Sequence, residues 1–268
     1  MNKKIFSENC NLSSYTTIKV GGLAEYFAEP RSIQEFSYLI KWANLNKQRC
    51  QIIGAGSNLL INNTFIKCLV VCTKKLKSLK IDLYSGNVEG EAGVMLPTLS
   101  NSLAKNGLQG GEWAVGIPGT LGGAIYMNAG TGSLSLAKNL ISVKVINNKT
   151  NKKLEIEKKD IDFEYRFSSF QSNNLAIISA KLHFEPNGNL EQLIQTTKNN
   201  LKLKTETQPY HLPSFGSVFK NPENNYAAKL IEDMGLKGFK IGGAEISTMH
   251  SNFIVNTCLL YTSPSPRD

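Results

Sequence analysis

Two glycine-rich segments are the parts of this sequence whose residue types and spacing could do chemistry. The first follows the expected short strand Gln51–Ile53 and reads Gly54-Ala55-Gly56-Ser57-Asn58-Leu59-Leu60. A glycine turn directly after a strand can aim backbone N–H groups at a phosphate, because glycine permits close approach and positive φ. Leu59 replaces the third glycine of a Rossmann fingerprint, and no Gly-Lys-Ser/Thr follows, which excludes a P-loop. A plain tight turn remains the alternative.

The second segment, residues 107–130, contains eight glycines among 24 residues. Each glycine costs about 1 kcal/mol relative to alanine in a helix interior, so propensity does not explain this density. Main chain that lies against a large flat ligand would need such glycines. A glycine-rich loop over the core is the alternative interpretation.

The elements that must position these segments follow from capping and periodicity. Ser32 and Glu35 form a capping box, and apolar residues then recur at helical spacing up to about Asn46. Pro97 opens a second helix, which ends at Asn106-Gly107. The other expected elements are strands at 51–53, 69–72, 88–93 and 175–184, a hairpin of 141–146 with 154–156, helices at 190–204 and 226–234, and strands at 239–241 and 253–255.

The composition excludes several classes of protein. The 268 residues are 41% apolar, with 12 Phe and 9 Tyr, which suits a packed core in roughly two domains or one elaborate one. This composition excludes a disordered or collagen-like chain. The net charge of +9 favours anionic partners. No apolar run approaches the roughly 20 residues of a membrane span, and no signal-peptide core is expected. Five scattered cysteines are typical of a reduced cytosolic chain, and no metal site is expected.

Two lysine clusters lie outside the glycine-rich segments. They comprise Lys74, Lys75, Lys77 and Lys80, and Lys152, Lys153, Lys158 and Lys159. Solvated faces are the simplest interpretation, since no aromatic ladder interleaves the lysines; a nucleic-acid stripe is the alternative.

Seven motifs run in order along nearly the whole chain, from about Asn11 to Thr257. They are Tyr15–Gly22, Gly54–Leu60, Gly116–Ala124 with Met127–Gly130, Tyr165–Phe170, Gly216–Pro222, Ala227–Glu232 and His250–Asn256. Together they resemble the UDP-N-acetylenolpyruvoylglucosamine reductase family, and the compact second half is similar to its shorter, type II branch.

The resemblance implies an α+β fold. An FAD-binding domain of the vanillyl-alcohol-oxidase (PCMH) type is expected over residues 1–186, in subdomains of about 1–72 and 73–186. A smaller α+β substrate-binding domain is expected over residues 187–257, after the stop signal Pro186-Asn187-Gly188. Residues 258–268 look foreign to the family, so this domain is expected to be incomplete because of a truncation at the C-terminus.

The resemblance also implies an NADPH- and FAD-dependent oxidoreductase of peptidoglycan precursor synthesis. It would reduce UDP-N-acetylglucosamine enolpyruvate to UDP-N-acetylmuramate. This small molecule is the expected substrate, and neither nucleic acid nor membrane insertion is expected. The protein is expected to be a cytoplasmic monomer.

Residue roles are carried over by motif. Arg166 matches the catalytic arginine, and Ser217 matches the proton donor. Hydride addition leaves negative charge on the alpha carbon, which is delocalised into the carboxylate, and the planar fork of an arginine suits that group. The expected cofactor-binding residues are Gly54, Ala55, Gly56, Ser57, Asn58, Leu59, Gly116, Ile117, Pro118, Gly119, Thr120, Gly122, Gly123 and Ala124. Lys220, Asn221 and Lys229 are expected to hold the substrate. His250 is expected to be structural or to support a residue that contacts the substrate, rather than to be catalytic.

The sequence departs from the family's pattern at three places. Tyr15 stands where asparagine is usual, and Thr131–Leu134 replaces a Gly-Gly-Glu stretch. No glutamate follows Glu245, although the family has a third catalytic residue, a glutamate, near its C-terminus. The protein is therefore expected to bind FAD but to turn over poorly.

Two other functions stay open. One is a different flavin-dependent oxidoreductase of the same fold. Such enzymes often tether FAD through a histidine or cysteine, and neither residue occurs in 54–60 or 116–130. The other is a basic nucleotide- or RNA-binding module.

Overall fold

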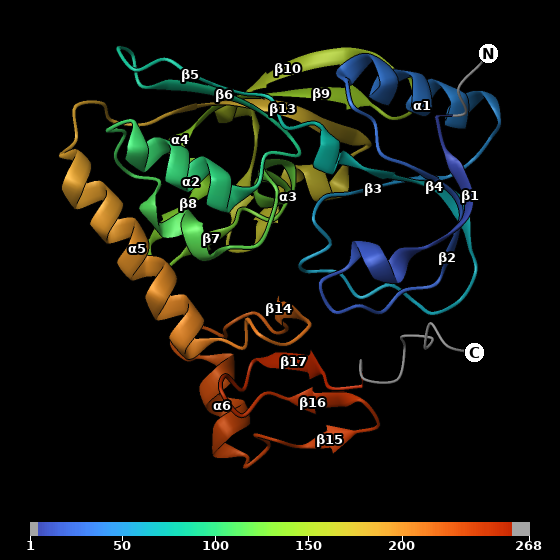
Figure 1. Cartoon of the computed structure of the whole chain (residues 1–268). Coiled ribbons are helices and arrows are strands. Elements are labelled where there is room, and N and C mark those ends of the chain that lie inside the picture. Colours follow the sequence, from blue (N-terminus) through green and yellow to red (C-terminus); the bar gives the residue numbers. More distant parts are fainter. Residues whose placement is uncertain (1–4, 259–268) are drawn as a thin grey trace, which may run out of the picture. The chain divides into compact units, whose positions relative to one another are not determined.

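The computed structural model describes residues 5–258, which divide into two compact units (Figure 1). The first unit comprises residues 5–11, 23–55 and 65–201, and the second comprises 12–22, 56–64 and 202–258. The division falls between Leu201 and Lys202, inside helix α5 (Leu190–Thr207), and two early segments join the second unit. The expected foreign tail lies outside the described residues from 259 onward.

A four-stranded sheet forms one part of the first unit. Its order is β1 (Ser7–Asn11), β2 (Leu23–Ala28), β4 (Ile66–Cys72) and β3 (Cys50–Ile53). The last three strands are parallel, and β1 is antiparallel to β2. Helix α1 (Ile33–Leu45) connects β2 to β3 and buries Phe36, Leu39 and Ile40, as its helical spacing predicts.

The predicted capping box starts α1, with one change. Ser32 Oγ accepts a hydrogen bond from the Glu35 N–H at 3.1 Å. The Glu35 carboxylate accepts from the Arg31 N–H at 2.7 Å rather than from Ser32. Both bonds satisfy donors at the helix start, so the predicted N-terminus of this helix is confirmed.

A five-stranded antiparallel sheet forms the rest of the first unit. Its order is β10 (Lys153–Glu157), β9 (Leu140–Asn147), β13 (Leu175–His183), β6 (Asn87–Glu91) and β5 (Leu79–Ile81), which confirms the predicted hairpin. Helices α2 (Leu96–Lys105), α3 (Leu121–Tyr126) and α4 (Leu136–Asn139) contribute to a core that includes Val143 and Val145. Ile146 and Ile178 belong to a second core, which contains the buried residues of α1.

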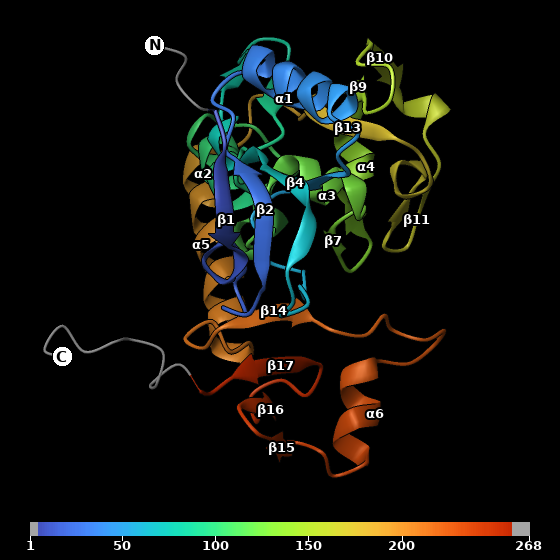
Figure 2. The same cartoon turned by 90° about the vertical axis from the view of Figure 1, so that its right-hand side faces the viewer.

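Side chains therefore alternate along β9 between two cores, so α1 and α3 cover opposite faces of this sheet (Figure 2). Shorter pieces complete the first unit. They are β7 (Gly130–Thr131), β8 (Leu134–Ser135), β11 (Phe163–Glu164), β12 (Phe167–Ser168) and 3₁₀ turns at Thr73–Lys75, Glu112–Gly116, Lys158–Asp160 and Ser169–Ser172.

The second unit contains an antiparallel sheet of order β14 (Ser214–Ser217), β17 (Phe253–Asn256), β16 (Ala244–Ile246) and β15 (Lys240–Ile241), with helix α6 (Ala227–Asp233). A 3₁₀ turn at Leu12–Tyr15 also belongs to it. Thr17 Oγ1 donates to the Ser214 carbonyl at 2.5 Å, and Asn256 Nδ2 donates to the Ile18 carbonyl at 3.0 Å. These bonds explain why an early segment belongs to this late unit.

The α+β class predicted from the sequence is confirmed. None of the described helices combines the length and the apolar character that crossing a membrane requires. Within residues 5–258, no group of three or more His, Cys, Asp or Glu side chains is arranged to hold a metal ion.

Candidate functional site

The two glycine-rich segments meet within the first unit. Thr120 caps α3, and its Oγ1 accepts from the Gly123 N–H at 3.3 Å. A Cβ atom added at Gly54 would overlap this same Thr120 Oγ1. Only glycine at position 54 therefore lets the turn after β3 approach the start of α3. The structure thus brings Gly54 into contact with Thr120 of the second glycine-rich segment.

A thiol and a hydroxyl from the end of β4 hold the turn after β3. Cys72 Sγ donates to the Gly54 carbonyl at 3.5 Å, and Thr73 Oγ1 donates to the Ile53 carbonyl at 3.3 Å. Burial raises the pKa of the Cys72 thiol to about 11. The thiol is therefore protonated at neutral pH and acts as a structural donor.

The rest of the first glycine turn belongs to the second unit. Gly56 has φ +66°, and a Cβ there would overlap the Tyr15 carbonyl oxygen. Asn58 Nδ2 donates to the Phe215 carbonyl at 2.8 Å. Among the described residues, the backbone N–H groups of Gly56, Ser57 and Asn58 donate to no protein acceptor. Such free successive N–H groups suit a phosphate.

The protein's own packing accounts for several glycines of the second segment. A Cβ at Gly122 would lie 2.9 Å from the Ala92 Cβ. At Gly111 it would overlap Leu103 Cδ1, and at Gly130 the Leu134 carbonyl oxygen. The interpretation that this glycine density as a whole reflects a flat ligand is therefore revised, because close internal packing explains these three positions.

Arg166 occupies a strained position in a tight hairpin. It is the second of two residues between β11 and β12, and its φ is +58°. Glycine or asparagine usually takes such a position, because a Cβ is strained there. The guanidinium lies 5.0 Å from the Tyr165 ring centroid, and its Nη2 donates to the Gly130 carbonyl at 3.1 Å.

Side chains tie this hairpin to the end of α3. Gln171 Nε2 donates to the Tyr126 carbonyl at 2.9 Å and to the Arg166 carbonyl at 3.3 Å. Ser168 Oγ donates to the same Tyr126 carbonyl at 2.8 Å. The structure thus brings Arg166 next to the predicted cofactor segment. Gln171 is a positioning residue that no sequence motif indicates.

Asn128 adds an unsatisfied acceptor to this region. Its Nδ2 donates to the Glu164 carbonyl at 2.9 Å, which holds the strand before Arg166. Its Oδ1 is buried and has no hydrogen-bond partner in the described part of the chain. A buried orphan acceptor is rare in a folded protein, and a bound ligand with an N–H or O–H donor would satisfy it.

Ser217 ends strand β14 in the second unit and is exposed. Of the predicted substrate residues, Lys220 is exposed, and Asn221 Oδ1 accepts from the Ala227 N–H at 3.1 Å, at the start of α6. Lys229 Nζ lies 3.3 Å from Asp233 Oδ2, and both side chains are largely exposed. Arg166 and Ser217 lie in different units, so the structure does not test whether they meet at one site.

Asn252, which sequence reasoning assigned no role, anchors the main chain beside Lys220. This buried residue accepts from the Phe219 N–H and donates to the Phe219 carbonyl, each at 2.9 Å. The neighbouring His250 packs edge-on against Phe253 at 4.8 Å. Burial lowers its pKa, with smaller effects of nearby lysines, so the ring is mainly neutral at pH 7. These contacts favour the structural role predicted for His250.

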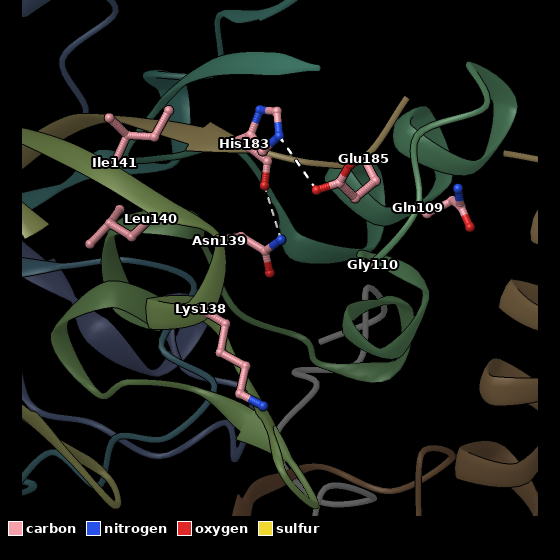
Figure 3. Close-up of a pocket in the computed structure, with 8 residues that line it drawn as sticks. All are labelled: Gln109, Gly110, Lys138, Asn139, Leu140, Ile141, His183 and Glu185. Carbon is pink, nitrogen blue, oxygen red and sulfur yellow. Dashed lines mark hydrogen bonds and ion pairs between the residues drawn. The ribbon is translucent and has the colours of Figure 1, made fainter. Parts of the chain in front are cut away.

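A hollow of about 330 Å³ in the first unit contains none of the predicted site residues (Figure 3). Its lining includes His183, whose Nε2 lies 3.7 Å from Glu185 Oε1. Asn139 Nδ2 donates to the His183 carbonyl at 3.0 Å. The predicted residues of the first unit lie outside this hollow: Gly54 contacts Thr120 at the start of α3, and the Arg166 hairpin is tied to the end of α3.

Gly54→Ala is expected to destabilise the first unit, because the new Cβ displaces Thr120 Oγ1 from its cap. Losing an N-cap costs about 1 kcal/mol, so the free energy of unfolding should fall by at least that amount. Chemical denaturation of the single and double variants with Thr120→Ala measures the coupling. The double variant should lose less stability than the two single losses together. Strict additivity would show that the two side chains do not compete for one space.

Comparisons with known proteins agree with this geometry. Residues 24–152 match the family model described as an FAD binding domain. Residues 208–259 match the C-terminal domain of UDP-N-acetylenolpyruvoylglucosamine reductase. The reductase of that name from Prochlorococcus marinus subsp. pastoris (strain CCMP1986) is 73% identical over 94% of this chain and 85% of its own length. The one from Synechococcus sp. (strain CC9605) is 47% identical over 92% of this chain and 82% of its own length.

Two solved structures are similar to this chain. The crystal structure of UDP-N-acetylenolpyruvylglucosamine reductase from Thermus caldophilus has a TM-score of 0.79 and 32% identity, over 94% of this chain and 89% of that chain. Phl p 4.0202, a glucose dehydrogenase, has a TM-score of 0.52 at 14% identity, over 69% of this chain and 42% of that one, and shares the fold alone.

Proposed function

The chain belongs to the UDP-N-acetylenolpyruvoylglucosamine reductase family, and we propose from this membership which of its residues carry the reaction. It is an FAD-dependent oxidoreductase with a PCMH-type FAD-binding domain. It reduces UDP-N-acetylglucosamine enolpyruvate to UDP-N-acetylmuramate, with NADPH as reductant, in peptidoglycan precursor synthesis. When bound, FAD supplies the two-electron chemistry by accepting a hydride from NADPH and delivering one to the enolpyruvyl double bond.

The residues proposed to hold FAD are Gly54–Leu59, Gly116–Thr120 and Gly122–Ala124. Two features of the chain support them. The N–H groups of residues 56–58 make no hydrogen bond within the described residues, and fit the diphosphate. A Cβ at Gly54 would overlap Thr120 Oγ1, so the two glycine-rich segments meet at one place in the first unit.

Arg166 is proposed to stabilise the charge that develops on the substrate. Hydride addition to the methylene carbon leaves negative charge on the alpha carbon, delocalised into the carboxylate. A guanidinium fork can bind that carboxylate with two N–H groups, and it stays charged at any working pH. The hairpin supports this role because Gln171 and Asn128 fix its main chain before substrate arrives.

Ser217 is proposed to deliver the proton to the alpha carbon. A serine hydroxyl is a weak acid, but the carbanion is a strong base, so the transfer needs positioning rather than a low pKa. Lys220, Asn221 and Lys229 are proposed to hold the substrate, and Lys229 suits its diphosphate. The exposed positions of Ser217 and Lys220 support access by a substrate from solvent.

We also infer the domain boundaries of the protein, its cellular location and its oligomeric state. Residues 1–186 are proposed as the FAD-binding domain, in subdomains 1–72 and 73–186, and 187–257 as the substrate-binding domain. A cytoplasmic location is inferred, and the five cysteines, all free thiols, support it. A monomer is inferred as well, and light scattering after size exclusion would read the mass directly.

The observation that carries the proposal is the attachment of the Arg166 hairpin to helix α3, whose capping residue touches Gly54. The test is the visible absorbance of the purified protein under anaerobic conditions. NADPH should bleach a flavin spectrum, and UDP-N-acetylglucosamine enolpyruvate should restore it. A colourless protein, or a reduced flavin that this substrate leaves bleached, would contradict the proposal. Flavin that stays on the denatured protein would indicate a different oxidoreductase.

A further inference from the structure

Both lysine clusters noted in the sequence contribute to one hollow of the first unit, of about 630 Å³. The proposed reaction uses none of these lysines. The cations around the hollow come from four places: Arg31 precedes α1, Lys75 and Lys77 follow β4, Lys144 lies on β9, and Lys153 lies on β10. The fold therefore concentrates positive charge from segments that lie far apart in the sequence.

Most of this charge is not neutralised. Glu91 is a carboxylate of the lining, and its Oε2 accepts from the Ser78 N–H at 2.8 Å. Lys144 pairs with Glu89 at 2.6 Å. Arg31, Lys75, Lys77 and Lys153 form no ion pair within residues 5–258. Unpaired like charges around one hollow repel each other, and an anion in the hollow would relieve that repulsion.

The hollow lies on the opposite face of the five-stranded sheet from the glycine-rich segment. Ile178 lines the hollow and belongs to the core under α1. Leu121 of α3 belongs to the core on the other face, and a Cβ at Gly90 would come within 2.8 Å of it. The neighbouring Glu91 therefore points away from α3, into the hollow. The basic hollow is separate from the residues proposed to hold the flavin.

We propose that this basic hollow binds a small anion that carries two or more phosphate groups. Its volume falls in the range of pockets that hold small molecules, about 300–1,000 Å³. Helix α1 begins at its rim with Ile33, but the Ser32 hydroxyl and the Glu35 carboxylate already accept from the N–H groups of Glu35 and Arg31 there. The attraction for a phosphate therefore comes from the lysine and arginine side chains around the hollow. The required chemistry is a polyphosphate, which a free ion or the tail of a nucleotide could provide.

The test is calorimetric titration of the cofactor-loaded 268-residue protein with pyrophosphate, orthophosphate and ATP at equal ionic strength. The site variant combines Lys75→Gln, Lys77→Gln and Lys153→Gln. The matched control combines Lys41→Gln, Lys105→Gln and Lys198→Gln, which remove the same charge from exposed positions of the same unit outside the hollow. A third variant, Lys229→Gln, removes the lysine proposed to contact the substrate diphosphate. Thermal unfolding checks that every variant is folded, and single substitutions replace any triple that is not.

We expect pyrophosphate to bind more tightly than orthophosphate. The site variant should bind pyrophosphate roughly tenfold more weakly, because each exposed lysine contributes only modestly. The control triple and Lys229→Gln should keep the affinity. If ATP bound more tightly than pyrophosphate, the site would be assigned to a nucleotide. If ATP and pyrophosphate bound equally, the site would be assigned to a free polyphosphate. The proposal would be overturned if pyrophosphate did not bind, or if both triple variants weakened its binding equally. It would also be overturned if an RNA oligonucleotide bound more tightly and displaced pyrophosphate.

Discussion

Ser217→Ala is expected to lower turnover by about 10²–10⁴-fold, the usual contribution of a general acid. The variant should still bind FAD, and NADPH should still bleach it at the wild-type rate. Only the return of colour on adding substrate should slow, because the proton for the alpha carbon then comes from solvent. Anaerobic stopped-flow measurement of the two half-reactions separates these steps.

Ser214→Ala is the matched control for this prediction. Ser214 begins the same strand, β14, so the substitution removes the same hydroxyl from the same element. Its half-reactions should match those of the wild type. If Ser217→Ala slowed both half-reactions equally, or slowed neither, the serine would not be the proton donor.

Arg166→Gly is expected to remove activity and to be more stable than Arg166→Ala. Both variants lose the guanidinium, so turnover should fall by about 10²–10³-fold, as when a preorganised charge-stabilising donor is deleted. They differ only at the backbone. The φ of +58° is strained for alanine but open to glycine, so Arg166→Gly should gain about 1 kcal/mol over Arg166→Ala. Chemical denaturation and NADPH-driven turnover measure the two effects.

Arg166→Lys completes this series. It keeps the positive charge and the strained backbone but loses the planar fork, so turnover should stay well below that of the wild type. If the glycine and alanine variants were equally stable, residue 166 would no longer adopt the left-handed conformation once the arginine side chain is removed. Wild-type turnover in the glycine or alanine variant would remove Arg166 from the mechanism, whereas wild-type turnover in Arg166→Lys would show that the charge suffices without the planar fork.

The strained arginine also explains why the hairpin needs its supports. Gln171, Ser168 and Asn128 each bond a main-chain carbonyl of the hairpin or of the α3 end. A left-handed conformation at a residue with a Cβ persists only where its surroundings over-determine it. The protein thus gives up stability at the position where the proposed chemistry needs a fixed charge.

Local pattern was enough to predict many of the elements, including helices α1, α2, α5 and α6. The capping box at Ser32, the apolar stripe of α1 and the polar turn between β9 and β10 depend on nearby residues alone. The two strands before α1 were not predicted. β1 reads Ser-Glu-Asn-Cys-Asn and is mostly exposed, so it carries no apolar alternation, and its pairing with β2 supplies the stability.

Helix α3 was missed for a related reason. Two adjacent glycines, Gly122 and Gly123, oppose a helix by propensity. Close packing of Gly122 on Ala92 and the Thr120 cap outweigh that cost, and neither is visible in a local window. Sequence patterns located the segment correctly but attributed all of its glycines to a ligand.

The sequence by itself determined the family, the fold class and the residues with which the chemistry is proposed, because motifs in register carry that information without coordinates. Only the tertiary structure decided that Gly54 touches Thr120, that Arg166 is held in a left-handed turn, and that residues 12–22 and 56–64 fold with the late unit. These facts depend on contacts between residues up to 238 positions apart, as between Ile18 and Asn256. Close packing selects such contacts among many sequence-compatible alternatives, and no local propensity encodes them.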